Sequence, residues 1–433
     1  MEKMLLKRLR ILNPHADKFD ENKLYDILIE SDRIEKIAES GTIKSEDAKL
    51  YDFDGRIASP GFRDTHSHFR EPGFEYKEDI ITGAKAAARG GYTSCILMAN
   101  TKPVVDNEKV LSYVINRGKE ACISIYSAAN ITRGMLGKEL SDFQELKKAG
   151  AKVLTDDGKP ITDENLMRSA MEKSVKEGMI LSMHEEDPAY IKEQGINEGK
   201  TAKSLGLIGA SSEAEYLMVA RDIRLAEKTG ATIVIQHVSA KESVDMVREA
   251  KRRGLKVYAE ATPHHFSMNE ADLIGLNGLG KMTLAKVNPP IRTEEDRMAI
   301  INGLKDGTID VIATDHAPHS ISDKDRPFTL APSGMIGLET AFSLAVTNLV
   351  TPGYLSLREL IIKLVYNPYE IYGVGSCKIE EGGVSDITVF DENESVTYTN
   401  FLSKSQNSPF DGKTLRGKIL MTVAKGKIAY ESY

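Results

Sequence analysis

The chain has 433 residues, of which 41% are hydrophobic, and a formal net charge of −7 with both signs mixed along its length. That size allows a large buried core, and the lack of a basic block argues against nucleic acid as a partner. No apolar run is long enough for a membrane span or a signal peptide, and the three cysteines are scattered without a CxxC pair, so we expect a soluble, cytoplasmic protein.

The two ends of the chain share one pattern. Residues 1–56 contain short segments in which apolar and polar residues alternate, as in LLKRLRILN and YDILIESDRIEKI. Residues 371–433 repeat the pattern in SDITVFD and GKILMTVAKG, between Gly, Asn and Asp turns. We predict that both ends form a single small β domain.

The middle of the chain, residues 57–370, alternates short apolar strands with amphipathic helical stretches. We count eight such pairs, and the clearest helices are predicted at 107–121 and 241–254. This α/β pattern predicts a (β/α)₈ TIM-type barrel, in which the chemistry lies at the carboxyl ends of the strands.

Polar residues of the kind that bind metals follow these strands. The first strand ends in DTHSH, and two histidines at a spacing of two lie on one face of a strand. Each residue alone also fits a core histidine or a turn-capping aspartate. The candidates are His66, His68, Asp157, His184, His237 and Asp315.

The joint pattern favours a metal site. Of the nine histidines, only His15 lies away from a predicted strand end. Four imidazoles and two carboxylates can hold two divalent ions, with one carboxylate bridging them. Zinc lowers the pKa of bound water from about 15.7 to about 7. Asp315 is our candidate for the general base and acid that accepts the proton and returns it to a leaving nitrogen. This machinery hydrolyses an amide or forms one by condensation.

Substrate contacts are expected at the same rim. Arg70 can pair with a carboxylate through two hydrogen bonds. Asn100, Asn288 and His319 also follow predicted strands. A surface ion pair for Arg70 and turns for the asparagines remain alternatives.

Several motifs together resemble the dihydroorotases of the amidohydrolase superfamily. DTHSHFREPG resembles the first signature of that family, and MANTKPVVD, TDDG, QHVSA, EATPHH, KVNPPIR and ATDHAPH follow in the family's order. The resemblance implies a barrel with a small β domain, acting in the third step of pyrimidine synthesis. Such enzymes interconvert N-carbamoyl-L-aspartate and L-dihydroorotate.

The resemblance also implies roles for single residues. His66, His68 and Asp315 would hold one zinc, and His184 and His237 the other, with Asp157 as the bridge. The substrate would be bound by His68, Arg70, Asn100, Asn288, His319, Ser333 and Gly334.

Three positions leave questions open. In relatives of another subgroup a carboxylated lysine bridges the metals, and Lys152 lies early on the same predicted strand as Asp157. Ala99 and Glu185 depart from the common motifs, although neither is a proposed ligand.

Two other functions also fit the sequence. A hydantoinase or allantoinase would share the fold and the HxH pair, and an inactive dihydroorotase-like scaffold would assemble with aspartate transcarbamoylase. Homodimerisation, the number of metals at rest, and replacement of zinc by manganese or cobalt stay open. The polar segment 320–335 is expected to be a mobile loop over the substrate.

Overall fold

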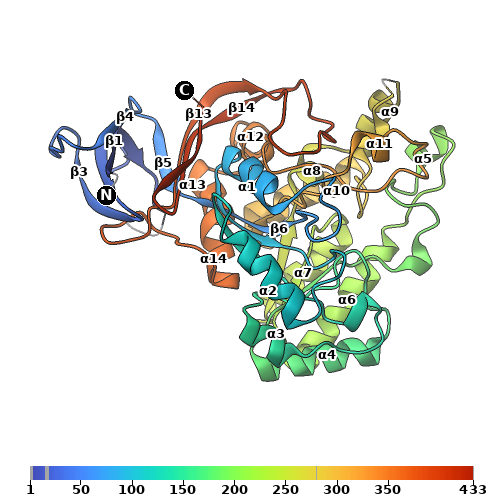
Figure 1. The fold of residues 1–433 in the computed structure, drawn as a ribbon. Coiled ribbons are helices and arrows are strands. Elements are labelled where there is room, and N and C mark those ends of the chain that lie inside the picture. The colour runs from blue at the N-terminus through green and yellow to red at the C-terminus, as the bar shows by residue number, and fades with distance from the viewer. Residues whose placement is uncertain (1–2, 15–18, 279, 433) are drawn as a thin grey trace.

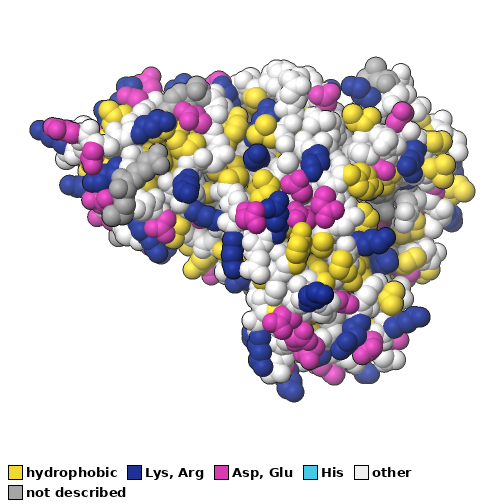
Figure 2. All heavy atoms as spheres, viewed as in Figure 1, with side chains coloured by type: hydrophobic (Ala, Val, Ile, Leu, Met, Phe, Trp, Pro, Cys, Tyr) yellow, Lys and Arg dark blue, Asp and Glu magenta, His cyan; other side chains and the backbone are white. Residues whose placement is uncertain are grey.

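The structure is a computed structural model that describes residues 3–14, 19–278 and 280–432. A β sheet forms one end of the molecule, and a larger body of helices around parallel strands forms the rest (Figure 1). Within the described residues, no helix combines the length and the apolar character needed to cross a membrane. Basic and acidic side chains are interspersed over the face shown in Figure 2.

The end sheet has eight strands drawn from both ends of the chain, in the order β15-β14-β13-β5-β1-β2-β3, with β4 paired to β1. Strand β13 pairs antiparallel with β5, so segments far apart in sequence meet here. Alternation buries one side of these strands in a core of their own, which includes Leu6 and Ile27. The strands are β1 Lys3–Ile11, β2 Tyr25–Glu30, β3 Arg33–Glu39, β4 Lys49–Asp52, β5 Ile57–Pro60, β13 Ile387–Thr397, β14 Thr414–Ala424 and β15 Lys427–Glu431.

The strands of the larger body are all parallel and form two sheets. They are β6 Phe62–Ser67, β7 Tyr92–Leu97 and β8 Ser124–Ser127 in one, and β9 Leu181–Met183, β10 Ile233–Ile235, β11 Val257–Ala261 and β12 Val311–Ile312 in the other. Isolated parallel bridges link the two sheets on both sides. Leu154 bridges Ala129 and Leu181 on one side, and Ser67 bridges His316 on the other.

The fourth predicted strand is reduced to the single bridging residue Leu154. On the side of β9, its N–H donates to the carbonyl of Ile180 and its carbonyl accepts from Ser182; on the other side, Ala129 pairs with its neighbours Val153 and Thr155. Beyond it, the carboxylate of Asp156 accepts the backbone N–H groups of Ile131 and Thr132 at 2.9 and 3.2 Å. A side chain therefore replaces the backbone pairing that would have extended this strand.

Helices follow the parallel strands and enclose them. The two clearest sequence predictions are confirmed, since α2 and α7 lie within 107–121 and 241–254. The α-helices are α1 Ile80–Arg89, α2 Glu108–Gly118, α3 Phe143–Ala149, α4 Glu164–Glu177, α5 Lys200–Ser204, α6 Glu213–Thr229, α7 Lys241–Arg252, α8 Pro263–Ser267, α9 Glu270–Gly278, α10 Glu294–Asp306, α11 Ile321–Lys324, α12 Ala341–Ala345, α13 Leu357–Ile361 and α14 Asn367–Tyr372. Short 3₁₀ turns lie at η1 Arg133–Met135, η2 Pro188–Tyr190 and η3 Met282–Ala285, and π-helical turns at η4 Val346–Val350 and η5 Ile362–Tyr366.

The segment between β13 and β14 returns to the larger body (Figure 1). Within it, Asn407 accepts the backbone N–H of His319 at 3.0 Å and donates to the carbonyls of Ala317 and Gly334 at 3.3 and 3.1 Å. A residue from the far end of the chain therefore braces the two loops that follow β12.

Candidate active site

Buried histidines and aspartates converge at the carboxyl ends of the parallel strands. His66 is near the end of β6, and His68, His184, His237 and Asp315 follow their strands within a few residues. Asp157 lies in the loop after the bridging residue Leu154. Because parallel strands end at the same side of their sheet, residues more than 200 positions apart meet at one point.

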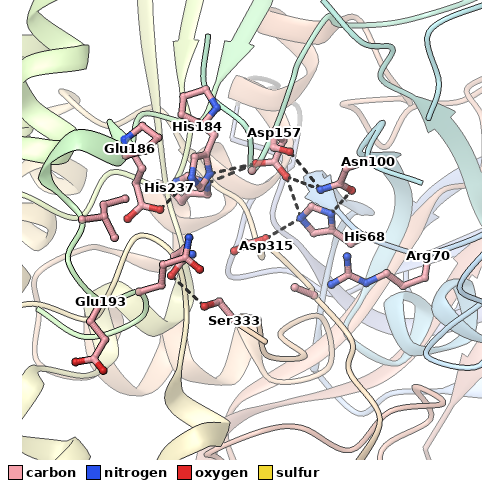
Figure 3. A pocket seen from close by; sticks show the side chains of 18 of the residues that line it. His68, Arg70, Asn100, Asp157, His184, Glu186, Glu193, His237, Asp315 and Ser333 are labelled. Carbon is pink, nitrogen blue, oxygen red and sulfur yellow. Dashed lines mark hydrogen bonds and ion pairs between the residues drawn. The ribbon is translucent and has the colours of Figure 1, made fainter. Parts of the chain in front are cut away.

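Asp157 occupies the middle of this cluster (Figure 3). Its Oδ2 lies 3.4 Å from Nε2 of His68. Its Oδ1 lies 3.4 Å from Nδ1 of His184, 3.7 Å from Nε2 of His237 and 3.6 Å from Nε2 of His66. One carboxylate thus lies among four ring nitrogens, three of them nearest Oδ1 and one nearest Oδ2, so both of its oxygens face imidazoles.

The electrostatics of the cluster match that geometry. Burial opposes the charge on Asp157, but the neighbouring histidines outweigh it and hold the pKa of this carboxyl well below its usual range. Burial likewise opposes the charge on His184, while Asp157 and Glu186 raise its pKa to about 10. Asp157 and Glu186 therefore favour positive charge beside His184.

The donor set fits a divalent metal. Two groups, His66–His68–Asp157 and Asp157–His184–His237, each place their ligand atoms within 4.8 Å of one another. Nε2 of His66 is fully buried and makes no hydrogen bond among the described residues. A buried ring nitrogen without a partner costs free energy unless a ligand satisfies it. Mixed imidazole and carboxylate ligands suit zinc-like ions.

Two further carboxylates contact the other ring nitrogen of two of these histidines. Oε2 of Glu260, on β11, lies 3.3 Å from Nδ1 of His66. Oε2 of Glu186 lies 3.1 Å from Nε2 of His184. With a metal ion bound, each contact would hold the proton of the ring on the outer nitrogen and leave the nitrogen that faces Asp157 free to bind the ion. Neither glutamate was predicted from the sequence, although Glu260 begins the motif EATPHH and Glu186 lies two residues after His184.

Asp315 lies against the HxH pair. Its Oδ1 is 2.9 Å from Nε2 of His68 and 3.5 Å from Nε2 of His66. Burial opposes its charge, yet these rings hold its pKa below the ordinary value, so it is a carboxylate at neutral pH. It also lines a cavity that adjoins the cluster. Asp315 can therefore contact both an ion and a substrate.

A cavity of about 330 Å³ opens onto the cluster (Figure 3). That volume suits a small ligand. The predicted residues that line it are His68, Arg70, Asn100, Asp157, His184, His237, Asn288, Asp315, Ser333 and Gly334. The segment Pro188–Gln194 forms another part of the wall, which no sequence motif indicated.

The predicted substrate contacts are also bonded to one another. Asn100 accepts from Nδ1 of His68 at 3.0 Å and donates to Asp157 at 3.2 Å, so it also orients the cluster. Ser333 donates to Asn288 at 3.0 Å. His319 lies behind this wall, with Nε2 at 2.9 Å from the carbonyl of Ser333. It therefore reaches the cavity through its neighbours.

Three site residues have left-handed backbone. The φ angles are 64° at Arg70, 29° at His237 and 46° at Asp315. Such angles are uncommon for residues other than glycine and concentrate where function fixes a side chain.

Other candidates lie outside the cluster. Nζ of Lys152 lies 5.4 Å from the centre of the Tyr126 ring, and Asp157 is the carboxylate among the imidazoles. His265 bonds to Thr262 and to the Pro289 carbonyl. The expectation that a metal explains every strand-end histidine was therefore too broad, because some of them pair with the surrounding polar groups.

Segment 320–335 is tied down at its base. Lys324 is buried and donates through Nζ to the carbonyls of Pro332 and Gly334 at 2.9 Å each. Ile321 and Leu330 are exposed in the same segment. Movement over the substrate, as expected from the sequence, stays a prediction.

The fold has close counterparts among solved structures. The L-hydantoinase (dihydropyrimidinase) from Arthrobacter aurescens matches with a TM-score of 0.86 over 100% of this chain and 96% of that one, at 21% identity. The dihydropyrimidinase from Brevibacillus agri matches with a TM-score of 0.83 over 99% and 95%, at 20% identity. The chain therefore has the fold of the hydantoinases and dihydropyrimidinases, with a histidine–aspartate cluster at the strand ends.

Sequence comparison is more specific. Residues 55–243 match the family model described as dihydro-orotase-like. A dihydroorotase of Clostridioides difficile is 50% identical over 99% of this chain and 100% of its own length. A dihydroorotase of Clostridium acetobutylicum is 51% identical over 99% of both chains. The chain belongs to the dihydroorotase family.

Proposed function

We propose that the chain is a zinc-dependent dihydroorotase that interconverts N-carbamoyl-L-aspartate and L-dihydroorotate in pyrimidine synthesis. The observation that carries the proposal is Asp157 at the centre of four imidazoles, beside a cavity that Arg70 enters. Full-length relatives named dihydroorotase support the substrate.

Two zinc ions would fit the proposed centre. His66, His68 and Asp315 would hold one, His184 and His237 would hold the other, and Asp157 would be shared between them. When bound, the metal would lower the pKa of water and polarise the carbonyl under attack. The preference for zinc rests on the mixed imidazole and carboxylate donors.

The protein's own groups carry the rest of the reaction. Asp315, a carboxylate beside His68, accepts a proton from the attacking water. As the substrate ring opens, it delivers that proton to the departing nitrogen. Arg70 pairs with the substrate carboxylate, Asn100, Asn288, Ser333 and Gly334 surround the ring, and His319 supports Arg70 and Ser333 from behind. In the direction of synthesis the same proton transfers run in reverse.

The architecture we infer is a closed (β/α)₈ barrel, residues 57–370, with a small β domain from 1–56 and 371–433. The bridges of Leu154 and Ser67 between the parallel sheets support closure. We place the enzyme in the cytoplasm, in keeping with its free cysteines Cys95, Cys122 and Cys377. A homodimer and a complex with aspartate transcarbamoylase are the assemblies to test by size measurement.

Hydrolysis of dihydroorotate, hydantoin and allantoin side by side tests the proposal. Dihydroorotate turnover well above the other two is expected, because Arg70 has a carboxylate to bind only in that substrate. The hydantoinase alternative rests on the shared fold, and faster hydantoin turnover would favour it. Zinc-loaded protein that turns over none of the three would favour the scaffold alternative.

A further inference from the structure

Behind the cavity wall, one ammonium group contacts His319. Nζ of Lys77 lies 3.0 Å from Nδ1 of His319 and 3.4 Å from Asp323. The side chain of Lys77 is 14% exposed, and it does not line the cavity. Its position therefore lets it act on His319 rather than on a substrate.

The contact fixes where the imidazole carries its proton. An ammonium group has donors and no acceptor, so Nδ1 of His319 must accept from Lys77. Burial lowers the pKa of His319, and the charges of Arg70, Lys77 and Lys324 lower it further, so the ring is neutral. A neutral ring that accepts at Nδ1 carries its proton on Nε2.

That proton points toward the substrate wall. Nε2 of His319 lies 2.9 Å from the carbonyl of Ser333, which accepts its proton; the guanidinium of Arg70, at 3.4 Å, is then a neighbouring charge and not a hydrogen-bond donor to this nitrogen. Ser333 in turn donates to Asn288 at 3.0 Å. A chain of contacts therefore runs from Lys77 through His319 to the residues that line the cavity.

Several cationic side chains lie close together around these contacts. Burial lowers the pKa of Lys77, and the charge of Arg70 lowers it further. Burial lowers the pKa of Lys324 to about 7, with Lys286 and Arg70 adding to the effect. Cations held this close to one another favour an anion in the adjoining cavity.

We propose that Lys77 is a positioning residue for substrate binding: it holds His319 as the neutral ring protonated at Nε2, and so arranges the wall that receives the substrate carboxylate. This inference rests on the proposed function for its substrate. It assigns Lys77 no contact with the substrate and no part in the proton transfer. Its removal therefore weakens binding more than it slows the chemical step.

The kinetic test compares Lys77→Met with Lys77→Arg and Asp323→Asn in the zinc-loaded enzyme. Lys77→Met should raise KM for dihydroorotate about tenfold and change kcat less than about threefold, the size expected for one lost charged hydrogen bond. Lys77→Arg restores a cationic donor and should recover most of the loss. Asp323→Asn removes the ion pair but leaves the contact with His319, so KM should stay near wild type.

Two kinetic results would overturn the proposal. One is an unchanged KM in Lys77→Met with intact metal and folding. The other is an equal rise in KM in Asp323→Asn, which would assign the effect to the ion pair. Thermal unfolding of each variant identifies damage to the fold.

A measurement independent of turnover uses ¹⁵N-histidine-labelled protein, with His319 assigned through His319→Gln. Long-range proton–nitrogen spectra should show His319 protonated at Nε2 in wild type and a mixed state in Lys77→Met. A wild-type ring protonated at Nδ1 would refute the inference even if Lys77→Met fails to fold. Absent dihydroorotate turnover in zinc-loaded wild type would instead refute the proposed function, and the spectra would still decide the role of Lys77.

Discussion

Replacing Glu260 with glutamine tests how the metal ligands are oriented. The carboxylate is buried and faces three donors: the hydroxyls of Thr65 and Tyr372, at 2.7 and 3.2 Å from Oε1, and Nδ1 of His66, at 3.3 Å from Oε2. A glutamine oxygen can serve the two hydroxyls, but its NH₂ then faces His66. Two N–H donors cannot hydrogen-bond to each other, so the imidazole of His66 must move its proton from Nδ1 to Nε2, the nitrogen that faces Asp157.

The size of the effect follows from these contacts. A hydrogen bond to a charged group contributes about 1.5–3 kcal/mol. Each 1.4 kcal/mol corresponds to about a tenfold change in an equilibrium constant. Glu260→Gln should therefore weaken zinc binding by about 10- to 100-fold, the range typical of lost partners of metal-bound histidines.

Competition with a chromophoric chelator measures the zinc affinity directly. Tyr372→Phe is the matched control, because it removes one donor from Glu260 without touching His66, and its affinity should stay within about threefold of wild type. Thermal unfolding of the metal-free proteins separates lost affinity from lost folding. Wild-type affinity in a folded Glu260→Gln protein would refute this account of ligand orientation.

Three further changes probe other parts of the molecule. Asp315→Asn should lower kcat at least about 100-fold with folding retained, and substantial turnover at normal metal content would remove Asp315 from proton transfer. Glu186→Met should weaken zinc binding about tenfold. Glu186→Gln should bind zinc nearly as tightly as wild type, because its side-chain oxygen still accepts from Nε2 of His184; equal zinc affinities in these two variants would contradict this role of Glu186. Burial lowers the pKa of Lys363 to about 8 from 10.5, so the folded protein loses this proton before the unfolded chain does. The free energy of unfolding of wild type should therefore rise relative to Lys363→Met between pH 8 and 10.5, by up to about 3 kcal/mol, and a constant difference in urea titrations would contradict that assignment.

The members of the buried histidine–aspartate cluster could be predicted because most of them lie at or just after the end of a recognisable strand. An apolar strand that ends in a polar residue is a local signal, and parallel topology then brings such ends together. The spacing of His66 and His68 is a local signal, but alone it is weak. His184, His237 and Asp315 needed the joint pattern, since each alone also fits a packed or capping residue.

The orienting groups could not be found this way. Glu260 reaches His66 across 194 positions of sequence, and Lys77 reaches His319 across 242. Their roles depend on which ring nitrogen they face, which no periodicity encodes. Asn407 lies in a segment grouped with the terminal β strands, yet it braces His319.

The length of the fourth barrel strand was also not predictable from the sequence. The stretch before Asp157 has the composition of a strand, but only Leu154 pairs as one. Asp156 takes the backbone N–H groups that a longer strand would have used. Competition between side chain and backbone acceptors depends on tertiary placement, so the sequence alone overestimates such strands.

Dihydroorotate hydrolysis before chelation, after chelation and after zinc restoration tests the central claim most directly. The account predicts turnover that disappears with the metal and returns with zinc, and that does not return in Asp157→Ala, which lacks the central carboxylate of the cluster. Turnover that persists in metal-free protein, or that zinc restores fully in Asp157→Ala, would contradict it.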